Sequence, residues 1–219
     1  MAGSALEQLG ISQETVESVK PEEVYEGKTI PSALYTVAVD KAYIRKTDSG
    51  AKMLEVDFIM EDGEPFHYST CVLSGDEKGN KSTYTTKQGK EVALPGVTSM
   101  TKFLTAIDSL NASASVGTVK HKDENIEALC FSGLQGKKLQ IGINQEESFY
   151  QGDVLLKNDV KYWLDAEGKN ASGEDLTEKV KESLEKHPLK KLRAQNKPGA
   201  TATAGTTGGS EAPKASSGW

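Results

Sequence analysis

The 219-residue sequence predicts a mainly β protein with one helix inside the fold and a second helix near the C-terminus. Three observations support this class. Only 36% of the residues are hydrophobic and 21 are glycine, a composition untypical of a helical bundle. Segments in which apolar and polar residues alternate recur between residues 34 and 164, with the period of a half-buried strand. Two other segments repeat apolar residues every three or four positions, as a helix with one buried face does.

Three consecutive strands are expected first, joined by two tight turns. Residues 34–46 are rich in Tyr, Val, Thr and Ile, which favour strands. Residues 52–60 alternate strictly, and residues 66–73 follow as a third strand. Turns at residues 47–50 and 61–63 separate them, so the three strands form an antiparallel meander. The core side chains expected from the second strand are Leu54, Val56, Phe58 and Met60.

A polar segment at residues 74–94 follows the meander. It contains four lysines and one tyrosine, and no acidic residue stands between Lys78 and Lys90. We expect a long loop here, because compact domains keep connections of about 20 residues only when these are functional or disordered.

One helix is expected after this loop, beginning at Pro95, because apolar residues then recur at the spacing of a single helix face. A second polar stretch at residues 111–125 leads to strands at residues 138–144 and 153–164. The last segment is either one strand or a hairpin broken at residues 157–159. The apolar positions of the helix are Val97, Met100, Leu104 and Ile107.

The resulting order of three strands, one helix and two further strands is that of an OB-fold, a five-stranded Greek-key barrel with a helix between strands 3 and 4. We expect this barrel over residues 32–166. An open sandwich built from the same strands is the alternative.

The segments on either side of the barrel differ from it in composition. Residues 1–31 are expected to form an acidic lead-in with a short helix, and residues 189–219 a basic and then low-complexity, disordered tail. A C-terminal helix is expected within residues 167–188, where residues 172–175 resemble a capping box with aspartate in place of glutamate. Its apolar positions are Leu176, Val180 and Leu184.

Composition disfavours several classes of protein. No run of about 18 apolar residues occurs, so no membrane span is expected. The N-terminal residues lack the order of a secretory signal, and Cys71 and Cys130 are too far apart for a redox motif. We therefore expect a soluble intracellular protein with no membrane partner. The net charge of −6 still allows a polyanionic partner, because charges further apart than the Debye length of about 8 Å are screened.

Basic residues are interleaved with aromatic residues in the first strand, the third strand and the long loop. This mixture suits a sequence-tolerant binder of single-stranded DNA, because bases stack on aromatic rings while cationic groups hold the phosphates. The alternative for each aromatic residue is a place in the core. The candidate DNA-contacting residues are Tyr43, Arg45, Lys46, Lys52, Tyr68, Lys78, Lys81, Tyr84 and Lys87.

Five short segments of the sequence resemble bacteriophage-encoded single-stranded DNA-binding proteins of the OB-fold type, over roughly residues 30–175. The resemblance implies non-catalytic coating and protection of single-stranded DNA during phage replication and recombination, without cofactors, in the cytoplasm of the bacterial host cell. The segments are Leu34–Val37, Ala42–Tyr43, Thr47–Gly50, Leu54–Phe58 and Gly168–Glu174.

The resemblance also implies partners besides single-stranded DNA. Many such proteins recruit replication or recombination proteins through an acidic tail that ends in an aromatic residue. This chain ends in Trp219, but the preceding residues contain only Glu211 and Lys214 as charged side chains, so the tail departs from that pattern. A homodimer is left open.

The residues also allow three alternatives to DNA binding. The two histidines and two cysteines His67, Cys71, His121 and Cys130 match the donor count of a zinc site but not its spacing. The acidic face of the second strand and the turn after it, with Glu55, Asp57, Glu61 and Asp62, would suit a Mg²⁺-dependent nuclease, but alternation explains Glu55 and Asp57 as a solvated strand face. A virion or scaffold protein is the third alternative. We expect no bound metal and no enzymatic activity.

Overall fold

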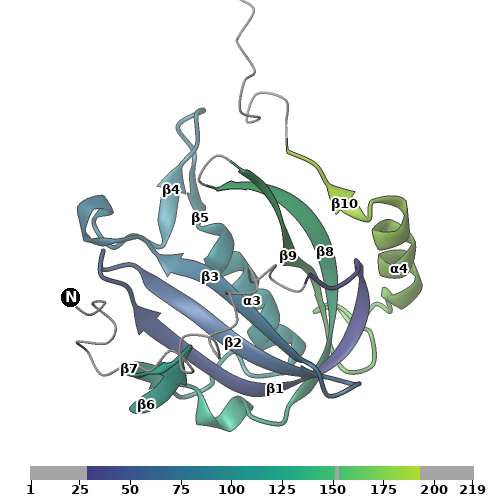
Figure 1. The fold of residues 1–219 in the computed structure, drawn as a ribbon, viewed down its shortest axis with the longest axis horizontal. Helices are drawn as coiled ribbons and strands as arrows, with labels where there is room; N and C mark the ends of the chain where they lie inside the picture. The colour runs from purple at the N-terminus through teal and green to yellow at the C-terminus, as the bar shows by residue number, and fades with distance from the viewer. Residues whose placement is uncertain (1–28, 151–152, 193–219) are drawn as a thin grey trace, which may run out of the picture.

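The computed structural model describes residues 29–150 and 153–192, which form a mainly antiparallel β-sheet with two α-helices packed against it (Figure 1). The predicted mainly β class is therefore confirmed. The α-helices are α3 (Pro95–Ala106) and α4 (Thr177–Lys186), and short 3₁₀ turns lie at Asp76–Lys78 and Ser132–Leu134. The strands are β1 (Ala33–Lys46), β2 (Lys52–Met60), β3 (Pro65–Leu73), β4 (Thr83–Thr85), β5 (Glu91–Ala93), β6 (Ser115–His121), β7 (Glu124–Cys130), β8 (Lys138–Tyr150), β9 (Asp153–Leu164) and β10 (Leu189–Lys190).

Strand β1 is the central strand of the sheet. Its pairing with β2 is antiparallel from Val37 to Lys46, with an irregularity between Val39 and Lys41. Its other edge is divided, because residues 33–38 pair with β8 whereas Tyr43 and Ile44 pair with β7. The main strands consequently follow one another in the order β9–β8–β1–β2–β3, and the β6–β7 hairpin is attached beside them.

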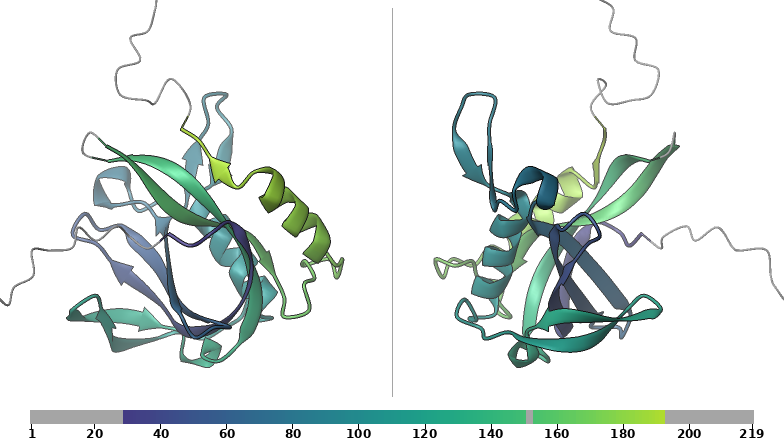
Figure 2. Two further views of the ribbon diagram at one scale, coloured as in Figure 1. Left: turned by 45° about the vertical axis from the view of Figure 1, so that its right-hand side comes forward. Right: turned by 90° about the vertical axis from the view of Figure 1, so that its left-hand side faces the viewer.

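The main core lies inside the curve of this sheet, which bends strongly around it (Figure 2). Helix α3 packs against β3 and β9. The ring of Phe103 from α3 meets Phe58 from β2 edge-on, with 6.0 Å between ring centroids, and contacts Trp163 from β9 at 5.6 Å. Aromatic pairs at such distances add stabilisation beyond their buried area. These three rings join β2, α3 and β9 into one body.

Helix α4 covers a smaller core on the other side of the sheet. Val180 and Leu184 are buried there with Leu164. The Tyr162 and Ser183 hydroxyls are hydrogen-bonded at 2.8 Å, which ties the helix to β9. Strand β10 follows α4 and pairs in parallel with β8 at Gln145 and Glu146.

The strongest periodic patterns of the sequence are confirmed. The four apolar residues expected in the core from the second strand are all buried. The helix beginning at Pro95 is present, and its Phe103 and Leu104 are buried. The expected C-terminal helix is present too, with Val180 and Leu184 facing the sheet.

The polar segments contain more structure than the sequence predicted. The expected loop at residues 74–94 holds a 3₁₀ turn and the β4–β5 hairpin, and the polar stretch at residues 111–125 holds β6 and the start of β7. Strand β8 continues well beyond residue 144, and residues 153–164 form one strand rather than a broken hairpin.

The C-terminal segment also differs from the prediction. Helix α4 begins at Thr177 without a side-chain cap, and Oδ1 of Asp175 instead accepts a hydrogen bond from the backbone N–H of Thr177. Residues 189–190 form β10, not the start of a disordered tail. The remaining predictions for the lead-in and the tail fall on residues 1–28 and 193–219, outside the described residues. None of the helices in the described residues is long and apolar enough to span a membrane.

We expect Gly96→Ala to destabilise the fold. Gly96 lies in the first turn of α3, and a Cβ placed there would stand 2.0 Å from the backbone carbonyl oxygen of Cys71 in β3. Helix and strand would have to separate, so the free energy of unfolding in urea is expected to fall by about 1–3 kcal/mol, the usual cost of overpacking.

Gly133→Ala is the matched control, because nothing lies within 4 Å of the Cβ position at Gly133. Its effect on the free energy of unfolding should stay within about 0.5 kcal/mol. Equal effects of the two substitutions would contradict the close approach of α3 to β3.

Candidate nucleic-acid interface

The turn between β1 and β2 is held against the segment that follows β3. The backbone N–H of Asp76 donates to the carbonyl oxygen of Ser49 at 2.9 Å. Gly50 has a φ of +80°, and a Cβ there would clash with the side chain of Asp76. A glycine is therefore required both by the turn and by the close contact. Two segments about 25 residues apart in sequence become one surface.

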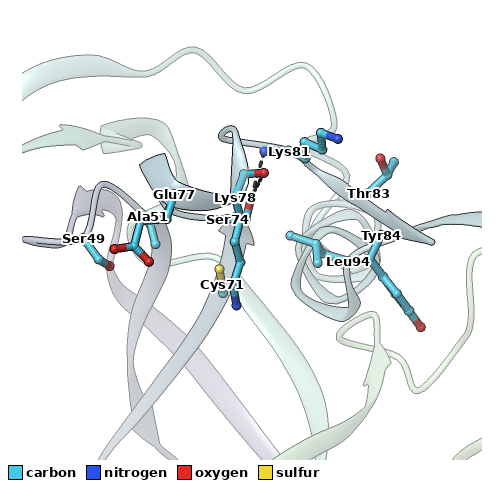
Figure 3. A pocket seen from close by; sticks show the side chains of 11 residues that line it. Ser49, Ala51, Cys71, Ser74, Glu77, Lys78, Lys81, Thr83, Tyr84 and Leu94 are labelled. Carbon is cyan, nitrogen blue, oxygen red and sulfur yellow. Dashed lines mark hydrogen bonds between the residues drawn. The ribbon is translucent and has the colours of Figure 1, made fainter. Parts of the chain in front are cut away.

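A pocket of about 610 Å³ opens between these segments. Figure 3 shows that Ser49 and Ala51 line it from one side, whereas Thr83, Tyr84 and Leu94 line it from the other. Lys78 and Lys81 also belong to the lining. The pocket thus combines apolar walls with an aromatic ring and two ammonium groups, the mixture that a nucleobase with its phosphate requires.

The β4–β5 hairpin carries the aromatic residue of this pocket away from the sheet (Figure 1). Tyr84 pairs with Val92 in the hairpin and is 46% exposed, so its ring is open to a stacking partner. Lys87 lies at the exposed tip of the hairpin, in the turn closed by the hydrogen bond from Gly89 N–H to Thr86 O.

A second pocket, of about 460 Å³, lies on the other side of the β1–β2 turn. Lys46 and Lys52 line it together with Val116 and Leu129 of the β6–β7 hairpin. The Lys46 ammonium group stands 3.9 Å from Asp76 Oδ2, so this lysine lies between the two pockets. We use the name basic rim for five exposed residues that line the two pockets, together with Lys87 at the hairpin tip: Lys46, Lys52, Lys78, Lys81, Tyr84 and Lys87.

Three of the nine predicted site residues are not part of this rim. Tyr43 is 1% exposed and Tyr68 is 6% exposed, so neither ring has a face free for a base. Tyr68 instead packs edge-on against Trp163, with 5.2 Å between centroids. Nε of Arg45 donates to Oε1 of the fully buried Glu55 at 2.6 Å, which neutralises its charge. The stacking role predicted for the two tyrosines is corrected, because both are core residues. Arg45 also lines the second pocket with a side chain that is 23% exposed, so its contact with DNA stays a prediction.

A cluster of charged side chains lies on the outer face of the sheet, beside Arg45. Nε2 of His67 lies 3.1 Å from Oε2 of Glu55, and Nδ1 of His67 donates to Oδ1 of Asp57 at 2.6 Å. Hydrogen bonds to Asp57 and then to Glu55 raise the pKa of His67 to about 9. His67 is therefore protonated at neutral pH, with each ring nitrogen facing a carboxylate.

The pKa values of the two carboxylates, Glu55 and Asp57, are lowered. The hydrogen bond from His67 is the largest reason why the pKa of Asp57 is lowered. Burial by itself would raise the pKa of Glu55, but hydrogen bonds from His67, Ser69 and Arg45 outweigh it and lower that pKa. We call these four residues, Arg45, Glu55, Asp57 and His67, the ionic cluster.

The β6–β7 hairpin lies over one side of the ionic cluster. The hydroxyl oxygen of Tyr43 and Nδ1 of His121 are hydrogen-bonded at 2.9 Å, and the rings of His121 and His67 are 6.3 Å apart. Burial, followed by the charges of Asp57 and Glu55, raises the pKa of Tyr43 to about 12. Tyr43 therefore stays neutral and keeps its proton for hydrogen bonding.

These contacts correct the expectation that Glu55 and Asp57 form a solvated acidic face. Glu55 is fully buried, and both carboxylates face basic partners. Glu61 and Asp62 line a different pocket at the opposite end of β2. The four carboxylates of the nuclease hypothesis are thus not gathered in one place.

The cysteines and histidines of the zinc hypothesis each have other partners. The thiols of Cys71 and Cys130 donate to the backbone carbonyl oxygens of Leu73 and Ala128. His67 faces carboxylates and His121 faces Tyr43. Across residues 29–150 and 153–192, no three His, Cys, Asp or Glu side chains are grouped in a way that would hold a metal ion.

No model of a protein family matches the chain, and no curated protein matches it either. The assignment of a function therefore depends on the fold and on the surfaces described above.

Protonation of His67 should make stability depend on pH. The pKa of His67 is about 9 in the folded protein and about 6.5 when unfolded. The stabilisation is therefore fully present below about pH 6.5 and is lost as the pH rises through 9. We expect the free energy of unfolding, measured in urea at pH 6.5, 7.5 and 9, to decrease over this range, and the decrease to become smaller in His67→Gln.

The exposed His187, at the C-terminal end of α4, provides the control. His187→Gln should leave the pH dependence as it is in the unmodified chain. If His67→Gln and His187→Gln show the same dependence, His67 is not the titrating group.

Proposed function

We propose that this chain binds single-stranded DNA without sequence preference and without catalysis, and that the basic rim is its binding surface. The observation that carries the proposal is the meeting of the β1–β2 turn with residues 74–94. Four lysines and one open aromatic ring line two pockets there, and a fifth lysine, Lys87, lies at the tip of the β4–β5 hairpin. Stacking accepts every base and ammonium groups follow the backbone, so this arrangement favours sequence-tolerant binding.

The strand order supports the proposal of DNA binding, because it is the order expected of an OB-fold. The pairing order β9–β8–β1–β2–β3, with α3 following β3 in sequence, is the order of the five strands in an OB-fold. Helix α3 lies between β3 and β9, the strands at the two ends of this order. OB-folds bind oligonucleotides on the face of strands 2 and 3 and at the loops between strands 1 and 2 and between strands 4 and 5. In an OB-fold the β1–β2 turn would be the first of these loops and the β8–β9 turn the second.

The net charge of the basic rim indicates whether stacking or phosphate contacts contribute more to the binding free energy. Asp76 and Glu77 lie among its lysines, so the local excess of positive charge is modest. Stacking on Tyr84 should therefore supply a large share of the affinity, and the lysines should mainly position the strand. This balance favours single strands over duplex DNA, in which the bases are already stacked.

The biological setting that we propose follows the resemblance described from the sequence. The protein would coat and protect single-stranded DNA during the replication and recombination of a bacteriophage, in the cytoplasm of the bacterial host. Replication or recombination proteins that bind its C-terminal tail would be its partners.

The salt dependence of binding tests the role of the lysines. Each phosphate contact to a single strand contributes about −0.7 to the slope of log K against log salt. We expect an oligothymidine to bind more tightly than a duplex in fluorescence anisotropy. We also expect the slope to become less negative by about 0.7 in Lys81→Gln.

Lys179→Gln changes the charge equally but on the exposed face of α4, so the slope should not change. Binding that is equal for duplex DNA, or insensitive to salt, would contradict the proposal. Mg²⁺-dependent shortening of the DNA would favour the nuclease alternative instead.

Tyr84→Ala tests the stacking contact. We expect the free energy of binding to single-stranded DNA to weaken by about 1–3 kcal/mol, while the melting temperature stays unchanged because Tyr84 is exposed. Tyr84→Phe retains the aromatic ring and should bind like the unmodified chain. Loss of folding in Tyr84→Ala, or equal binding by both variants, would show that Tyr84 is not a stacking platform.

A further inference from the structure

The distal part of the β8–β9 ribbon has an open apolar edge. Val154, Leu155 and Leu156 are consecutive in β9, and each is 46–49% exposed. Among the described residues β9 pairs only with β8, so its other edge has no strand beside it. Figure 2 shows this ribbon extending beyond the rest of the sheet. Because side chains alternate along a strand, both faces of the ribbon are apolar at this point.

An exposed apolar edge strand is a template for pairing with another strand. The charges around this edge indicate the kind of partner. Glu146, Glu147, Asp153 and Asp159 lie on this ribbon, against Lys157 of β9 and the adjacent Lys190. A mainly acidic surface repels a polyanion, so this edge favours a protein strand rather than DNA.

The sequence of the edge is complementary to itself. In an antiparallel pair of two copies centred on Leu155, Asp153 stands opposite the second copy's Lys157, and Lys157 opposite its Asp153. Lys157 Nζ stands 2.8 Å from Glu146 Oε1 within its own copy, so it would be shared between the two carboxylates. Leu155 meets Leu155 on the same face, between the two ion pairs. Val154 meets Leu156 on the other face, so every apolar side chain gains an apolar partner.

Other alignments of the two edges lose this match. A pair centred on Leu156 would put Asp153 opposite the second copy's Asp159. A parallel pair would put Asp153 opposite Asp153 and Lys157 opposite Lys157. Like charges that face each other across two strands are destabilising. A pair centred on Asn158 would put Lys157 opposite Asp159, but it would also put Leu155 opposite Lys161 and lose the apolar match. Charge and apolar matching together therefore favour the antiparallel alignment centred on Leu155.

We propose that this chain forms a symmetric homodimer in which the β9 strands of two copies pair antiparallel over Asp153–Lys157. The interface is isologous, because the same edge serves both copies and no third copy can add to it. The sheets of the two copies then form one continuous sheet across the dimer, and the open edge of β9 is covered. This inference does not depend on DNA binding.

Sedimentation equilibrium of the full-length chain without DNA, from about 1 to 100 μM, tests the dimer. The unmodified chain should reach twice its mass of 23.5 kDa. Leu155→Lys places two ammonium groups opposite each other at the two-fold axis, and the dissociation constant is expected to rise by about 100-fold or more. Leu110→Lys is the control, because Leu110 is also exposed but lies outside the strands, and it should remain dimeric.

A pair of charge variants tests the alignment. Asp153→Lys and Lys157→Asp should each be monomeric alone, since each places like charges at both ends of the paired region. Mixed in equal amounts they should form a heterodimer, because every lysine then faces an aspartate. A variant that merely failed to fold would not recover on mixing.

Different results would overturn the dimer and the proposed alignment. A monomeric unmodified chain over the whole concentration range, or a Leu155→Lys variant that dimerises as well as Leu110→Lys, would overturn the dimer. Charge variants that dimerise alone, or that stay monomeric when mixed, would overturn the alignment centred on Leu155. DNA binding measured on the same samples reports separately on the basic rim.

Discussion

The fold depends on the division of one edge of β1 between two partners. Residues 33–38 of this edge pair with β8, and Tyr43 and Ile44 pair with β7. The first interaction brings β9 and its Trp163 onto the core. The second places the β6–β7 hairpin beside the end of the β1–β2 pair, where Lys46 and Lys52 emerge. One strand thereby fixes both the core and the position of the basic rim.

The ionic cluster explains how a sheet with polar residues on its outer face keeps that face ordered. Glu55 is fully buried, and burying an unpaired carboxylate would cost several kcal/mol. Arg45 and His67 compensate its charge from the strands on either side. The pairing holds β1, β2 and β3 in one register, because a slip of one residue would turn these charges into the core. Arg45, which the sequence offered as a DNA contact, therefore also has a structural role in this cluster.

The sequence predicted the elements in which local pattern and tertiary environment agree. Alternation in residues 52–60 and the apolar stripe from Val97 to Ile107 each require one buried face, and each has it. The β6–β7 hairpin was missed because only one of its residues, Ala128, is fully buried, so polar residues dominate it. The turn at Lys122 and Asp123 between Val119 and Ile126 was the available signal. Burial of Tyr43 could not be read from β1, since it results from that hairpin.

His67 gives the folding reaction itself a proton requirement. The imidazole binds its second proton weakly in the unfolded chain and firmly between Glu55 and Asp57 in the folded one. Between about pH 6.5 and 9 the chain must therefore take up to about one proton from solvent each time it folds. Folding therefore takes up a proton from the buffer in this pH range, and unfolding releases a proton to it.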